Sequence, residues 1–333
     1  MKHPSELLRS PEYYPLRSDP ASREVSFVRM SRETYRDSVF LDMRTRHLGS
    51  AYTLRLDDVI LAASGINFKP LPVTYILHPA FCCSTLLSRY LELLDFCFVL
   101  REPLLLTQVA LSSSDPTPQW EELFDCSIKL LTRGYEDARW IVIKAHEPCN
   151  VLGRKLLEHD ERATVVFLTT PQRQFVLSVL KSSERRTWIR SRVCEVLAQG
   201  VAGVDWEAVR PSALTDAQAA ACMWTVNDGL RRRLFAVEQR ERVLFLDSNQ
   251  LIDDPQQTLR RITRTCKQHL DDKEIAGMVE HPAMKKYSKD ISRAYDANSR
   301  RSEIAQLEDR FGSEVDAGIE WAARHSSPAA AVA

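Results

Sequence analysis

The chain has 333 residues, enough to bury the core of one large α/β domain or of two smaller ones. Its 45 basic and 45 acidic residues cancel, so no overall field favours nucleic acid or an anionic membrane. The eight cysteines form no CxxC pair and no zinc-like cluster, which favours a reduced, cytoplasmic chain without a metal. The N-terminus lacks the apolar core of a signal peptide, and no run approaches the ~20 apolar residues of a membrane span.

Residues 1–70 are expected to form an N-terminal extension that packs on the core. They contain a predicted helix at Ser31–Arg44 and a strand-like segment at Tyr52–Leu56, which leads to the apolar Val59–Ala63.

Residues 71–270 alternate between short apolar segments and amphipathic ones. This order predicts an α/β core of three layers, αβα, around a central, mainly parallel sheet with right-handed crossovers. The predicted strands are Val73–Leu77, Phe96–Leu100, Trp140–Lys144, Thr164–Thr169 and Val243–Asp247. The predicted helices are Ser84–Leu94, Trp120–Arg133, Val151–His159, Gln172–Lys181, Ala217–Gln239 and Pro255–Leu270.

Two further parts are expected around this core. Residues 182–240 form a helical insertion whose beginning is rich in arginine. Residues 271–333 form a basic and then helical C-terminal segment, whose last residues, 326–333, are expected to fray.

Polar groups follow every predicted strand. In an open parallel sheet, ligands bind beyond the carboxyl ends of the strands, so these groups are expected to meet along one edge. They are His78 with Ser84–Thr85, then Arg101–Glu102, Lys144 with His146, Thr169–Thr170 and Asp247–Ser248.

A helix is predicted to begin at Ser84, directly after a strand and an irregular loop. Hydroxyl groups and first-turn amides in this setting bind a phosphate or phosphosulfate group, with support from the helix dipole. The alternative is an ordinary helix cap, for which Ser and Thr are preferred. The adjacent Cys82 and Cys83 are interpreted as small residues packed in the loop rather than as redox groups.

Lys144 and His146 lie two residues apart on an extended segment, so their side chains are expected to point the same way. A histidine there is able to accept a proton from an attacking hydroxyl group at neutral pH. The lysine would stabilise negative charge on a bridging oxygen. The alternative is a strand end that emerges into solvent with polar residues.

At these segments the chain resembles the sulfotransferase family, which has the P-loop fold and uses 3′-phosphoadenosine-5′-phosphosulfate (PAPS) as donor. Ala80–Leu87 is similar to the loop that binds the donor phosphosulfate, and Trp140–His146 to the Ile-Ile-Lys-Thr/Ser-His stretch of the cytosolic branch. Phe167–Ser178 is similar to the second donor motif, in which an arginine and a serine hold the 3′-phosphate. Lys285–Lys286 lies where the family often has a basic loop over the nucleotide.

The resemblance implies a divergent, bacterial-type member with a P-loop NTPase-like fold. The implied reaction transfers a sulfuryl group from PAPS to a hydroxyl or amine of a small acceptor, with His146 as base, Lys144 assisting and no metal. The implied donor-binding residues are Phe81, Cys82, Cys83, Ser84, Thr85, Leu86 and Ser178.

Four features depart from the family pattern, one of them the spacing of Ser178, which lies one residue later than usual after the proline. Phe81 stands where the loop has a basic residue, Cys83 where it has glycine, and Thr169 where the second motif has arginine. Phe81 and Thr169 favour an alternative, a catalytically inactive nucleotide-binding or protein-interaction module of the same fold. A P-loop kinase is less favoured, because Gly-Lys-Ser/Thr is absent.

Overall fold

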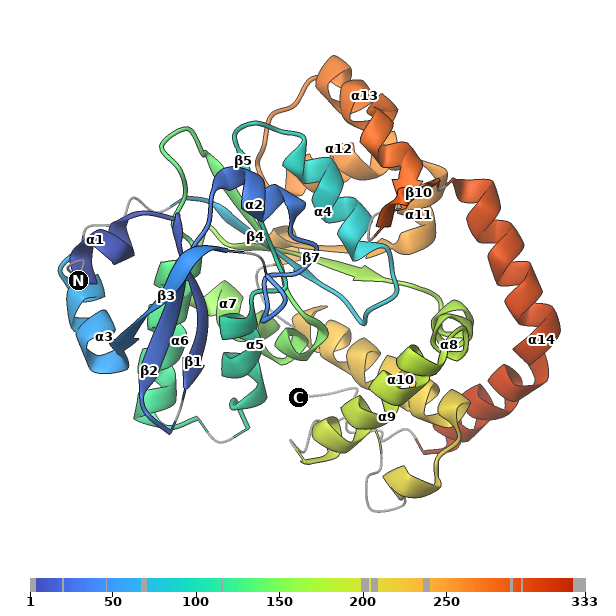
Figure 1. The fold of residues 1–333 in the computed structure, drawn as a ribbon. Helices are drawn as coiled ribbons and strands as arrows, with labels where there is room; N and C mark the ends of the chain where they lie inside the picture. The colour runs from blue at the N-terminus through green and yellow to red at the C-terminus, as the bar shows by residue number, and fades with distance from the viewer. Residues whose placement is uncertain are drawn as a thin grey trace. The chain divides into compact units, whose positions relative to one another are not determined.

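The computed structural model describes residues 4–19, 21–45, 47–66, 71–114, 116–198, 204, 209–235, 240–287, 290–294 and 296–325. The chain divides into two compact units, one made of Met1–Leu77 and Thr85–Val165, the other of His78–Ser84 and Val166–Ala333. Figure 1 labels their helices and strands. The end of the helix predicted to reach Gln239 and the expected frayed residues 326–333 lie outside the described residues.

Five strands form a parallel sheet flanked by helices, in the order β5-β6-β4-β7-β8. β4 is in register with β6 from Val73 opposite Ile141, and β5 with β6 from Cys97 opposite Trp140. Every residue of β4, β5 and β6 is buried, as expected for strands covered on both faces. The predicted α/β fold is therefore confirmed. The strands are β4 Val73–Leu77, β5 Cys97–Arg101, β6 Trp140–Lys144, β7 Thr164–Thr169 and β8 Val243–Asp247.

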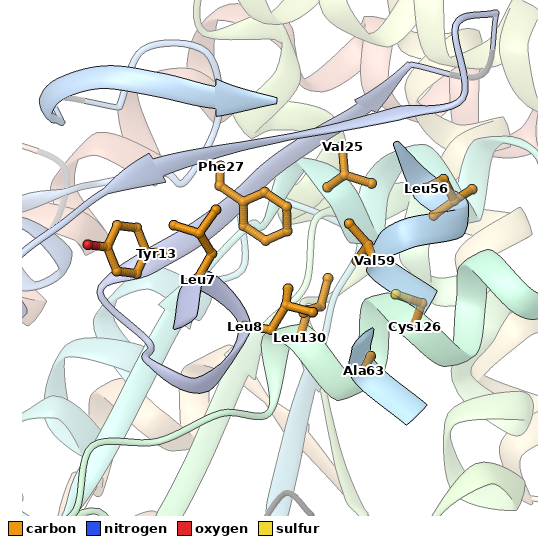
Figure 2. Packing of buried hydrophobic residues seen from close by; sticks show 10 residues of the cluster. All are labelled: Leu7, Leu8, Tyr13, Val25, Phe27, Leu56, Val59, Ala63, Cys126 and Leu130. Carbon is orange, nitrogen blue, oxygen red and sulfur yellow. The ribbon is translucent and has the colours of Figure 1, made fainter. Parts of the chain in front are cut away.

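A second, antiparallel sheet of three strands lies in the N-terminal residues of the first unit, in the order β1-β2-β3. Its strands are β1 Tyr13–Asp19, β2 Glu24–Arg29 and β3 Leu48–Arg55. Figure 2 shows side chains of β1 and β2 gathered with those of α1 (Pro4–Arg9), α3 (Leu56–Ser64) and α6 (Pro118–Leu131). Of this sheet, only the region of β3 was predicted, and Val59–Ala63 belongs to α3.

The helix predicted at Ser31–Arg44 is wrong beyond its first turns, because α2 covers only Arg32–Asp37. The buried Arg101 side chain donates hydrogen bonds to the carbonyls of Tyr35 and Ser38 at 3.2 and 2.6 Å, which ends the helix. The chain then runs beside the end of β5, where the Leu41 amide donates to the Arg101 carbonyl at 2.7 Å. Residues 38–44 are thereby fixed next to the carboxyl end of this strand.

The helices of the first unit that follow β4 keep the predicted order with one addition, α5 (Leu104–Leu111). α4 covers Ser84–Glu92, and its first residue, Ser84, is the last residue of the 78–84 segment that belongs to the second unit. α7 covers Gly153–His159 and follows a 3-10 turn at Glu147–Leu152.

In the second unit, α8 (Gln172–Leu180), α9 (Ser183–Ala198) and α10 (Asp216–Phe235) pack together, and α14 (Ala297–Arg324) packs on α8 and α10. The predicted helical insertion therefore contains two long helices. The remaining elements are α11 Ser248–Asp253, α12 Pro255–Thr265, α13 Asp272–Glu280 and the short strands β9 Lys286–Tyr287 and β10 Asp290–Ala294. None of the helices in the described part of the chain combines the length and the apolar character needed to cross a membrane.

Candidate functional site

The loop between β4 and α4 has a strained backbone. Ala80, Phe81 and Cys83 have φ angles of 73°, 53° and 64°, in the left-handed region that residues other than glycine rarely adopt. Cys83 thus takes the conformation expected of the glycine that the loop lacks. The buried His78 supports the turn, because its Nδ1 accepts a hydrogen bond from the Ala80 amide at 3.0 Å.

The first turn of α4 carries the predicted hydroxyl groups. Ser84 and Thr85 are both buried residues. Because the first amides of a helix have no acceptor within it, this turn offers several donors to an anion. Cys82 and Leu86 are buried as well, so only their main-chain groups are suited to binding a ligand.

An aromatic and cationic cluster surrounds the Phe81 side chain. Its ring centroid lies 6.0 Å from that of Phe175 and 5.3 Å from that of Trp188. The Arg185 guanidinium lies over the same ring, 4.5 Å from its centroid. Arg185 Nη1 also donates to the Ser178 carbonyl at 2.7 Å. Phe81 and Ser178, both predicted donor-binding residues, therefore share Arg185 as a neighbour.

A second arginine contacts the loop at Cys83. Arg300, in the first turn of α14, places Nη1 2.6 Å from Cys83 Sγ. The other basic residues nearby on α8 and α9 are engaged elsewhere: Arg173 with Glu308 and Asp316, Lys181 with Glu303, and Arg186 and Arg190 with Asp216. Lys285 and Lys286 are exposed.

In the first unit, Lys144 is fully buried and forms an ion pair with Glu102. Its Nζ also lies 5.6 Å from the centroid of the Phe40 ring. Glu102 has a left-handed φ of 53°, and its amide donates to the Lys144 carbonyl at 2.6 Å. Burial excludes the interpretation of Lys144 as a solvated strand end, because a buried ammonium needs a partner.

His146 is half-buried and precedes the 3-10 turn at Glu147–Leu152. Asp42 lies within electrostatic range of its imidazole. Burial raises the pKa of Asp42, but the hydrogen bonds and charge of Arg44 and the nearby His146 outweigh it, so the pKa is lowered overall. Arg44 Nε donates to both carboxylate oxygens of Asp42 at 3.0 Å. Lys144 and His146 are thus accompanied by carboxylates from the strand end and from residues 38–44.

Sequence reasoning missed Asp42, Arg44, Arg185 and Arg300. Arg185 lies in the insertion that was recognised as rich in arginine, so a signal for it existed. Asp42 and Arg44 were assigned to a helix, which hid their position beside β5. Nothing near Arg300 in the sequence indicates that it contacts Cys83.

No family model and no curated protein matches the chain. Among solved structures, it is similar to sulfotransferase STF1 from Mycobacterium tuberculosis H37Rv, with 14% identity and a TM-score of 0.42 over 78% of this chain and 82% of that one. It is similar to the sulfotransferase domain of the curacin biosynthetic pathway, with 13% identity and a TM-score of 0.41 over 74% of this chain and 99% of that domain. Retinol dehydratase in complex with retinol and PAP gives 13% identity and a TM-score of 0.40, over 81% and 86% of the two chains. Because these sequence identities and TM-scores are low, the assignment of the fold rests on the strand order and registers given above.

Proposed function

We propose that the chain is a sulfotransferase that moves a sulfuryl group from PAPS to a hydroxyl or amine of a small acceptor. The observation that carries the proposal is the strained loop that joins β4 to the first turn of α4. Three of its residues, Ala80, Phe81 and Cys83, hold left-handed conformations without being glycine. Such conformations cost about 1–3 kcal/mol each, and they cluster where a ligand is bound.

In the proposed reaction, the acceptor oxygen or nitrogen attacks the sulfur atom. A bond from this atom to sulfur forms while the bond from sulfur to the bridging oxygen breaks, which releases 3′-phosphoadenosine-5′-phosphate. His146 accepts the proton that the acceptor loses. Lys144 stabilises the negative charge that grows on the bridging oxygen.

The carboxylates beside this pair fit supporting roles. Glu102 pairs with the buried Lys144 ammonium and so offsets the cost of burying its charge. Asp42 would stabilise the imidazolium that forms when His146 takes the proton. The proposal requires no metal, because donor charge is met by amides and cations.

The donor would be held by the hydroxyls of Ser84 and Thr85 and by main-chain amides from Cys82 to Leu86. Two observations support this assignment: Ser84 and Thr85 are buried where the loop enters α4, and the loop is bent without glycine. Ser178 is proposed for the 3′-phosphate, and Phe81 contributes its main chain only.

The test is the substitution His146→Ala. Loss of a general base lowers turnover by about 100-fold or more. We expect this loss with the affinity for 3′-phosphoadenosine-5′-phosphate unchanged within a few-fold, measured by a coupled assay of PAPS consumption and by calorimetry. The matched control is His159→Ala, since His159 lies in the same unit and interacts with Asp125 at 3.3 Å. Unchanged turnover in His146→Ala would end the assignment of the base.

The second candidate is an inactive module of the same fold. It is favoured by Phe81, whose ring packs against Phe175 and Trp188 in place of a basic side chain. The Lys144–Glu102 ion pair also favours it, because Glu102 offsets the catalytic charge. A protein that binds the nucleotide tightly and consumes no PAPS with any hydroxyl or amine acceptor would support this candidate.

A further inference from the structure

The donor loop carries no basic residue of its own, and the nearest basic side chains in the second unit differ in what they contact. Arg173, Lys181 and Arg190 pair with carboxylates of α14 and α10. Arg185 and Arg300 contact the loop residues Phe81 and Cys83. Positive charge therefore reaches the loop from helices that follow it in the sequence.

The position of Arg300 is fixed by the start of α14. Asp296 caps this helix by accepting a hydrogen bond from the Ser299 amide at 2.7 Å. The Arg300 side chain is half-buried, and its Nη1 donates to Cys83 Sγ at 2.6 Å. Cys83 is the residue directly before the first turn of α4, so this guanidinium lies beside the amides that are suited to an anion.

Arg185 is held against the loop's aromatic residue, Phe81. Its guanidinium stacks over Phe81 at 4.5 Å, and Nη1 donates to the Ser178 carbonyl at 2.7 Å. Among the described residues, Arg185 forms no ion pair within 4 Å, and the nearby Glu184 carboxylate acts on it only through its charge. A guanidinium has five N–H donors, so these two contacts leave donors for a ligand. Phe81 then acts as a platform that positions the charge.

We propose that Arg185 and Arg300 bind the phosphosulfate end of the nucleotide donor and supply the positive charge that the loop lacks. This inference rests on the proposed function. Phe81 and Cys83, the two departures from the family loop, become the residues that hold the replacement cations. Arginine suits this task because its planar fork matches phosphate and sulfate oxygens.

The experiment is a calorimetric titration with 3′-phosphoadenosine-5′-phosphate of the full chain and of Arg185→Ala and Arg300→Ala. We expect the Kd to rise about tenfold or more in each variant, because each loses a charge-assisted hydrogen bond. The matched controls are Arg190→Ala on α9 and Arg301→Ala on α14, which pair with Asp216 and Asp253 at 2.6 and 2.7 Å. Their Kd should stay within twofold.

The salt dependence of binding separates charge from structure. Each cation that contacts the donor contributes to the decrease of affinity with added salt, so the slope should be smaller in both variants. Where an alanine variant does not fold, Arg185→Lys or Arg300→Lys takes its place, with an intermediate Kd expected. If the wild-type chain binds the nucleotide and the variants keep its Kd and salt slope, this inference is overturned while the proposed function stands. If the wild-type chain does not bind it, both are overturned.

Discussion

Cys83 differs from the other cysteines of the chain in exposure and in its surroundings. It is half-buried beside Arg300, whereas six of the eight cysteines are buried and Cys194 is exposed. Burial raises the pKa of the Cys149 thiol to about 12 and that of Cys126 to about 11. Cys83 is more exposed than the six buried cysteines, so a reagent should reach its thiol more readily than theirs.

This contrast predicts the outcome of thiol labelling. At pH 8 the native protein should react with Ellman's reagent at two thiols, Cys194 and Cys83, and the unfolded protein at all eight. Cys149 should begin to react only as the pH approaches its raised pKa. The variants Cys83→Ser and Cys194→Ser assign the two signals. Rapid labelling of a buried cysteine, or a silent Cys83, would contradict the described loop.

At the scale of elements, α14 lies against α10 with little space between them. A Cβ atom on Gly318 would come within 2.8 Å of the Ala217 backbone and side chain. Because helices that approach this closely leave no room for a methyl group, α14 requires glycine at this point of contact. By contrast, a Cβ atom added to Gly277 in α13 would have no atom within 4 Å.

We therefore expect Gly318→Ala to lower the free energy of unfolding by about 1–3 kcal/mol through overpacking. The control, Gly277→Ala, should leave it unchanged or raise it by up to about 1 kcal/mol, because alanine is the better helix former. Urea unfolding followed by circular dichroism measures both. Equal stability of the two variants would contradict the packing of α14 on α10.

The sheet could be predicted from the sequence because its strands are short, apolar and buried on both faces. Other elements could not. α5 is a short apolar run with no clear periodicity, and β1 and β2 alternate too weakly to be recognised. The length of α2 depends on Arg101, which binds its final carbonyls from a distant strand. The division into extension, core and C-terminal segment stays a prediction.

At the scale of the whole molecule, the loop and the Lys144–His146 segment, each within its own unit, combine local and distant contributions. The loop and the Lys144–His146 segment could be predicted, because each is continuous in the sequence. The charges around them could not, since Arg300 is 217 residues from Cys83 and nothing in the local pattern connects the two. The absence of a basic residue from the loop sequence therefore does not show that the loop lacks positive charge, because a distant residue such as Arg300 contacts it.

The central claim is that the loop from Ala80 to Thr85 holds the phosphates of an adenosine nucleotide. Calorimetric titration of the wild-type chain with 3′-phosphoadenosine-5′-phosphate, without added metal, tests it most directly. ATP with and without magnesium serves as the comparison, because magnesium-dependent ATP binding would favour a kinase. The account predicts saturable, micromolar binding of the bisphosphate nucleotide; no heat of binding up to millimolar concentration would contradict it.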